Sequence, residues 1–171
     1  MAAGRLSGFP VLMYHGVARA AAEPVPPGER KYWVTAAQLR EHLLCIQDAG
    51  GRVARLSELW GSPASTDRRP WSVALSFDDG RDSDYEVAFP LLLEGRATAD
   101  FFVNTANIGM PGFLGWGQIR EMQRAGMSFQ SHGHEHVDLS RLRNHELRSQ
   151  IRESKQRLED GAGTAVEFLA V

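Results

Sequence analysis

Cysteine is nearly absent from this sequence, since Cys45 is the only one in 171 residues. An internal disulfide is therefore excluded, and the redox compartment stays open. Long apolar runs are absent too: no stretch of about 18 apolar residues occurs, which predicts that the chain has no membrane span. Positive charge is not in excess, because Lys and Arg number 19 against 21 Asp and Glu. Without a basic field, nucleic acid is not an expected partner.

The N-terminal segment, residues 1–17, carries one arginine and only a short apolar run. It lacks the long apolar region of a secretory signal, so we expect a cytoplasmic protein as the sequence stands, with a role at the cell envelope left open. Cys45 is expected to pack as a small apolar residue, because Leu39, Leu43 and Ile46 are spaced like one helix face. No pattern in the sequence predicts the oligomeric state.

Short apolar runs alternate with helical patterns along the chain. The runs predicted to be strands are residues 9–14, 51–56, 71–77, 97–105, 127–132 and 165–171. Among the predicted helices, one begins with a capping box of Thr35 and Gln38, and another contains Pro90, which should interrupt it. The alternation predicts parallel βαβ units and an α/β fold, with residues 1–171 as a single domain. Residues 18–34 contain three prolines and are predicted to be a mobile loop.

The last predicted strand has neither a covering helix nor a polar segment after it. An open parallel sheet that ended in this way would leave backbone groups unpaired and apolar surface bare. We therefore expect the 171 residues to be a partial domain, incomplete at the C-terminus, of a larger barrel-like fold.

Two adjacent carboxylates, Asp78 and Asp79, directly follow the apolar strand at 71–77. Like charges at this separation raise each other's pKa or require a cation. A purely structural alternative is a helix N-terminus, where the carboxylates would accept backbone N–H groups. The pair is therefore either a turn device or part of a chemical site.

Three histidines, His132, His134 and His136, lie within five residues at the end of the strand at 127–132. Imidazole is the commonest protein ligand for zinc-like metals, and two imidazoles with one carboxylate leave coordination positions open for water. Gly133 would allow a tight turn in which His132 and His136 point at one centre. The structural alternative is a solvated polar loop.

The aspartates and the histidines are both expected at the carboxyl ends of strands, which share one rim in parallel α/β folds. One carboxylate would then complete the metal shell. The adjacent carboxylate would accept a proton from a water held by the metal. Because both clusters are expected at one rim, a shared metal site is favoured over a turn device for the aspartates and a solvated loop for the histidines.

The motifs LSFDDG (75–80) and SHGHEH (131–136) resemble the first two motifs of the polysaccharide deacetylases, the NodB-homology or carbohydrate esterase family 4 domain. The likeness runs in order from residue 9 to residue 171. It implies a distorted (β/α) barrel and a metal-dependent hydrolase that removes N- or O-acetyl groups from a polysaccharide or amino sugar. It also implies Asp78 as the catalytic base, and Asp79, His132 and His136 as ligands of a divalent metal, with zinc as the first expectation. An acetylated carbohydrate is the partner implied.

Some parts of the family pattern have no counterpart here. The third motif and the late histidine that acts as general acid are missing from the 171 residues. His15, in MYHGV, matches a histidine of a related subgroup that would line the cleft. His134 is an extra candidate for a ligand or a substrate-facing donor. Either of these histidines is a candidate to protonate the leaving group.

Three other functions stay open at this point. The alternating His132, His134 and His136 also fit an HxH amidohydrolase-type site, because alternate residues of a strand share one face. A small-molecule amidase or deformylase of the same family would use the same motifs. The third alternative is a truncated relic that binds metal or carbohydrate without turnover.

Overall fold

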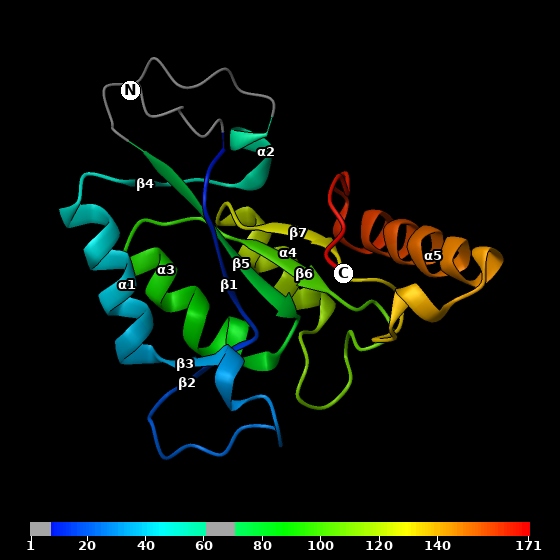
Figure 1. Cartoon of the computed structure of the whole chain (residues 1–171), viewed down its shortest axis with the longest axis horizontal. Helices are drawn as coiled ribbons and strands as arrows, with labels where there is room; N and C mark the ends of the chain where they lie inside the picture. The colour runs from blue at the N-terminus through cyan, green and yellow to red at the C-terminus, as the bar shows by residue number, and fades with distance from the viewer. Residues whose placement is uncertain (1–7, 61–70) are drawn as a thin grey trace, which may run out of the picture.

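Short parallel strands form the frame of the fold, which a computed structural model describes for residues 8–60 and 71–171 (Figure 1). The strands of the main sheet are β1 (Val11–Tyr14), β4 (Arg52–Val53), β5 (Ser72–Asp79), β6 (Asp100–Val103) and β7 (Ser128–Ser131). Their order is β1-β5-β6-β7, and β4 pairs with the start of β5. Every pairing between these strands is parallel. The predicted α/β fold with a parallel sheet is confirmed. Closure into a barrel stays a prediction, because the described strands form an open sheet.

Helices connect these strands and pack beside the sheet. In chain order the helical segments are the 3₁₀ turn η1 (Arg30–Tyr32), α1 (Ala36–Asp48), α2 (Leu56–Leu59), the π-helical turn η2 (Asp84–Ala88), α3 (Phe89–Glu94), α4 (Trp116–Arg124), the 3₁₀ turn η3 (Leu139–Arg141) and α5 (Asn144–Ala162). Both α4 and α5 contact β7, and α5 extends away from the sheet on that side (Figure 1). Among the described residues, no helix combines the length and apolar character that crossing a bilayer requires.

The sequence signals for helix ends are confirmed at two places. The Thr35 hydroxyl accepts a hydrogen bond from the Gln38 backbone at 3.2 Å, and the Gln38 side chain accepts one from the Thr35 backbone at 2.9 Å. This is the predicted capping box of α1. Pro90 lies in the first turn of α3, directly after the π-helical turn η2. A proline is tolerated there because the first helical N–H groups have no partner within the helix.

A second, two-stranded parallel sheet lies within and beside the segment that the sequence marks as a loop. It pairs β2 (Gly16–Ala18) with β3 (Trp33–Thr35), and the 3₁₀ turn η1 (Arg30–Tyr32) precedes β3. The sequence misses these strands because three residues are too few to show an alternating pattern. The mobility predicted for residues 18–34 stays a prediction.

An aromatic ladder fixes the register of the main sheet. Tyr14 of β1, Phe77 of β5, Phe101 of β6 and Phe129 of β7 are direct neighbours across the strands. Their stacked rings have centroid separations of 5.0, 5.0 and 5.3 Å, and all four side chains are buried. A slip of one residue would move this whole row to the other face, so the register is strongly specified. The residues that follow the ladder are therefore placed at a defined rim.

Two local predictions are wrong. Residues 165–171 form no strand; they make a single parallel bridge between Leu169 and Ser131. Cys45 is exposed and does not pack in the core. It lies two residues from Leu43, about 200° around the helix axis, so it cannot share the buried stripe of Leu39, Leu43 and Ile46.

Candidate metal centre

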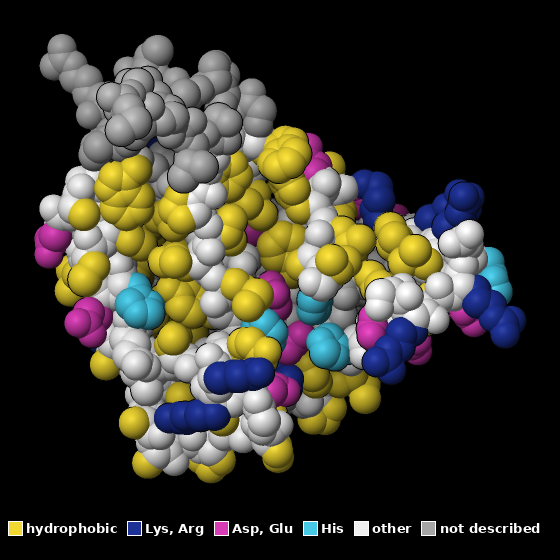
Figure 2. Space-filling model, viewed as in Figure 1, with side chains coloured by type: hydrophobic (Ala, Val, Ile, Leu, Met, Phe, Trp, Pro, Cys, Tyr) yellow, Lys and Arg dark blue, Asp and Glu magenta, His cyan; other side chains and the backbone are white. Residues whose placement is uncertain are grey.

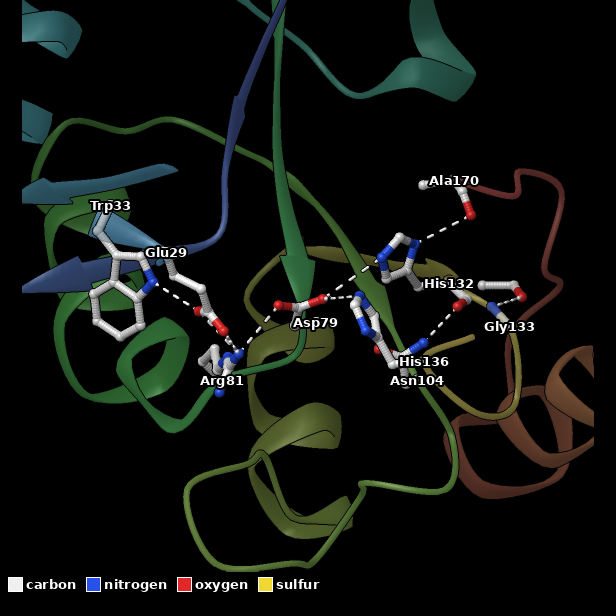
Figure 3. A network of polar contacts seen from close by, with 10 residues as sticks. Glu29, Trp33, Asp79, Arg81, Asn104, His132, Gly133, His136 and Ala170 are labelled. Atoms are coloured by element: carbon white, nitrogen blue, oxygen red, sulfur yellow. Dashed lines mark hydrogen bonds and ion pairs between the residues drawn. The ribbon is translucent and has the colours of Figure 1, made fainter. Parts of the chain in front are cut away.

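Asp79, His132 and His136 come together at the carboxyl end of the sheet (Figure 3). Asp79 Oδ1 lies 3.5 Å from His132 Nε2 and 3.4 Å from His136 Nε2. One ligand atom from each of the three residues lies within 4.8 Å of the others. Asp79 is buried, whereas the His136 side chain is 66% exposed. The cluster therefore reaches from the interior to the surface, where Figure 2 shows histidine and acidic side chains gathered near the middle of one face.

The sheet register explains this meeting. Asp79 is the partner of Val103, and Val103 is the partner of Ser131, so the ends of β5 and β7 lie level on either side of β6. The His132 backbone N–H then donates to the Val103 carbonyl at 3.0 Å, which continues the pairing by one residue. Gly133 follows with φ of +82°, a turn conformation that suits glycine. The chain turns there, and His136 also lies against the Asp79 carboxylate.

The backbone at the end of β5 adopts an uncommon conformation. Asp79 has φ of +76°, one of the few positive values at a described residue other than glycine, and Gly80 has φ of +72°. Such a conformation in a non-glycine residue has a cost of about 1–2 kcal/mol and is concentrated at functional sites. A Cβ at Gly80 would meet Val103 Cγ1 at 2.7 Å. The surrounding chain therefore holds the turn closely, and the turn sets where the Asp79 carboxylate lies.

The residues of this cluster fit a divalent metal. Asp79 Oδ1 is buried and has no hydrogen-bond partner among the described residues. An unpaired buried carboxylate oxygen is costly, and a cation would satisfy it. With ligand bonds of about 2.0–2.1 Å in a tetrahedron, two zinc ligands lie about 3.3–3.4 Å apart. The two Asp79–imidazole separations, 3.5 and 3.4 Å, are close to that value.

The buried imidazole of the cluster is held in an orientation suited to ligation. The Nδ1 atom of His132 lies 3.1 Å from the Ala170 carbonyl, and this contact assigns the ring proton to Nδ1 and leaves Nε2 free as a ligand. Burial lowers the pKa of His132, which favours the neutral imidazole that binds metals. The Asn104 side chain donates to the His132 carbonyl and steadies the same turn. The Ala170 carbonyl, which directly follows the Leu169–Ser131 bridge, thus holds His132 in position.

Asp78 lies beside this cluster on the same strand. Its carboxyl group is buried and has a pKa raised to about 6, chiefly because of burial, while His15 opposes the rise and the charge of Asp79 adds to it. His15 directly follows Tyr14, the partner of Phe77, so it is level with Asp78 across the two strands. The His15 ring stacks on Tyr32 at 4.6 Å, and its Nδ1 atom has no hydrogen-bond partner among the described residues.

His134 is not part of the cluster. Its Nδ1 atom lies 2.8 Å from the Thr105 hydroxyl, and its Nε2 atom lies 3.3 Å from a Glu153 carboxylate oxygen on α5. Both ring nitrogens are therefore engaged away from Asp79. This placement gives no support to the HxH amidohydrolase-type alternative, in which His134 would share the metal with a neighbouring histidine.

Two further features of the rim were missed by sequence reasoning. Arg81 contacts Asp79 and pairs with Glu29, a residue of the predicted loop. Asp84 is completely buried at the start of η2, where burial and the charges of Asp79 and Asp78 raise its pKa well above the ordinary value. The sequence DDGRDSD did contain a signal for both, because it places an arginine and a further acid directly after the aspartate pair.

Comparisons with known proteins identify relatives of this chain. The polysaccharide deacetylase family model matches residues 65–171. "Putative polysaccharide deacetylase YxkH" of Bacillus subtilis is 27% identical over 150 residues, which are 86% of this chain and 50% of the relative. The chain thus spans about half the length of the curated relative it matches.

Two solved structures show the same fold over most of this chain. The Streptococcus pyogenes deacetylase PplD in complex with acetate superposes with a TM-score of 0.80 at 25% identity, covering 94% of this chain and 72% of PplD. BC0361, a polysaccharide deacetylase from Bacillus cereus, superposes with a TM-score of 0.78 at 26% identity, covering 94% of this chain and 49% of BC0361. The chain belongs to the polysaccharide deacetylase family.

Proposed function

We propose that this chain is a metal-dependent deacetylase domain that hydrolyses N- or O-acetyl groups of a polysaccharide or amino sugar. The observation that carries this proposal is the cluster of Asp79, His132 and His136 with a buried second carboxylate, Asp78, directly beside it. Family membership supports the same conclusion. The relative PplD is a deacetylase whose structure is in complex with acetate, and it has the same fold as this chain.

Asp79, His132 and His136 would hold the divalent metal, for which zinc suits the donor set best. When bound, such a metal supplies an acidified water and polarises the oxygen of the acyl group. Asp78 would act as the general base and accept a proton at a carboxylate oxygen. A pKa of about 6 suits that task near neutral pH, because the group is mostly ionised there and still a useful proton acceptor.

His15 is the better of the two candidates for protonating the leaving group. It lies level with Asp78 and interacts with it electrostatically, and its Nδ1 atom is buried without a hydrogen-bond partner in the described residues. His134 is held by Thr105 and Glu153 instead. A general acid raises the reaction rate by about 10²- to 10⁴-fold, so rate measurements on variants can show which histidine has this role.

The test is acetate release from acetylated chito-oligosaccharides by the purified chain, first stripped with EDTA and then titrated with Zn²⁺. We expect release that depends on the added metal. Replacing His15 by Gln should lower the rate by about 10²-fold or more, whereas the matched variant His134→Gln should stay close to wild type. Tight zinc binding without acetate release, even with added imidazole or ammonium acids, would favour the non-catalytic relic. Equal release with and without metal would contradict the proposal.

A further inference from the structure

A row of four side chains connects β3 to the metal cluster (Figure 3). The Trp33 Nε1–H donates to Glu29 Oε2 at 3.2 Å. Both carboxylate oxygens of Glu29 accept from Arg81 Nη2, at 2.8 and 3.0 Å. The same Nη2 atom lies 3.4 Å from Asp79 Oδ2. Arg81 therefore stands between two carboxylates, one of which is a candidate metal ligand.

The two oxygens of Asp79 consequently have different surroundings. Oδ2 faces the Arg81 guanidinium, whereas Oδ1 faces the two imidazoles and has no hydrogen-bond partner among the described residues. The side chains are well shielded, with 6% of Asp79, 19% of Arg81 and 28% of Glu29 exposed. Charges that are shielded in this way interact more strongly than exposed ones.

Arg81 itself is held in place. Its backbone forms an antiparallel bridge with Phe113, and its guanidinium carbon lies 5.1 Å from the centre of the Phe113 ring. The guanidinium would therefore stay near Asp79 if its partner Glu29 lost its charge. An uncompensated guanidinium there would compete with a divalent cation for the Asp79 carboxylate and repel that cation.

We propose that Glu29 and Arg81 are positioning residues for the metal ligand Asp79. Arg81 holds Oδ2 in place, so that Asp79 would face the metal with Oδ1 alone. Glu29 balances the charge of Arg81, so that the guanidinium orients Asp79 without lowering the affinity of the site for the metal. This inference rests on the proposed function, because it assumes that the Asp79 cluster binds a divalent metal. It also gives the loop of residues 18–34 a part in the site.

The test measures zinc affinity directly, by titration calorimetry on the metal-free chain at constant pH. Removing a contact that orients a metal ligand changes affinity by about 10- to 100-fold. We expect Glu29→Gln to weaken Zn²⁺ binding by about 10-fold. The matched control is Glu23→Gln, which removes the same charge from the same loop but contacts Arg19. It should bind like wild type.

The double variant Glu29→Gln/Arg81→Gln separates charge balance from mere structural support. With both charges gone, and with an amide N–H still available at position 81, zinc affinity should return to within about 3-fold of wild type. The absorption bands of Co²⁺ in the site should change in Glu29→Gln and return toward wild type in the double variant. A structural loss alone would make the double variant bind no better than the single one.

The outcomes distinguish this inference from the proposed function. Tight zinc binding by wild type and equal affinity in Glu29→Gln and Glu23→Gln would overturn the positioning role alone. A double variant that binds as weakly as Glu29→Gln would overturn the charge-balance argument. Failure of the wild-type chain to bind Zn²⁺ would overturn both the proposed metal site and this inference.

Discussion

The Nε2 atom of His132 lies 3.5 Å from Oδ1 of Asp79, although the strand β6 separates the strands that carry them. The pairing Asp79–Val103–Ser131 makes the two strand ends level, and His132 is the next residue after Ser131. The candidate metal centre is therefore a direct product of sheet register. Changes to the candidate ligands should therefore alter metal affinity, whereas changes to the turn after β5 should alter the stability of the fold.

Loss of the Asp79 carboxylate should abolish tight metal binding. Asp79→Ala removes the only carboxylate of the cluster, and we expect Zn²⁺ affinity to fall by at least 100-fold in calorimetry. His134→Ala should leave affinity within about 3-fold, because His134 is held by Thr105 and Glu153. The reverse pattern, with metal lost in His134→Ala and kept in Asp79→Ala, would establish the HxH amidohydrolase-type site instead.

Asp78→Asn should separate metal binding from turnover. The amide has nearly the shape of the carboxyl group but cannot accept a proton, so acetate release should fall by about 10²- to 10⁴-fold. Zinc affinity should change little, since Asp78 is not among the three residues whose ligand atoms converge. Turnover that survives Asp78→Asn would rule out Asp78 as the base.

Ionisation of Asp78 should lower the stability of the metal-free chain as pH rises from about 4 to 6. Burial raises the pKa of Asp78 from 3.8 to about 6, so the folded state holds the proton more tightly than the unfolded state. The free energy of unfolding is then highest below pH 3.8, falls through this window and levels off above it. The raised pKa values of Asp84 and Asp100 act in the same direction, whereas the lowered pKa values of His132 and Glu58 act in the opposite one, so the share of Asp78 is isolated by comparison with a variant.

Asp78→Asn tests the share of Asp78 in that fall. A rise of the Asp78 pKa from 3.8 to about 6 corresponds to at most about 3 kcal/mol, so the variant should be about 1–3 kcal/mol more stable than wild type above pH 6 and similar to it near pH 4. Urea unfolding in EDTA from pH 4 to 7.5 measures the difference. Parallel curves for the two proteins would show that the Asp78 carboxyl is not penalised by burial.

The turn after β5 should tolerate no side chain at Gly80. Gly80→Ala places a Cβ 2.7 Å from Val103 Cγ1 in a left-handed conformation, and we expect a loss of about 2–4 kcal/mol in the free energy of unfolding. Gly112→Ala is the matched control: φ is +83°, but no atom of the described residues is in contact with the added Cβ within 4 Å. Its loss should be about 1–2 kcal/mol. Equal losses would mean that Val103 moves aside freely.

The sequence by itself determined the class of fold and which residues form the candidate site. The alternation of apolar runs and helical patterns is local, and so is the capping box of Thr35, which the structure reproduces. The pairs Asp78–Asp79 and His132–His136 stand at strand ends, and parallel strands bring such ends to one rim. These features depend on neighbours in the chain, which is why they could be predicted.

Only the tertiary structure decided how the members of the site are used. The sequence left His134 open as a ligand, and the packing of α5 turns it toward Glu153 instead. It gave no sign that Glu29 and Arg81 would meet, because the partners come from the β2–β3 connection and the turn after β5. The sequence also predicted a strand at residues 165–171, whereas these residues make one bridge to Ser131 and a contact to His132. Each of these depends on the distance between segments far apart in the chain, which local periodicity and motif spacing do not encode.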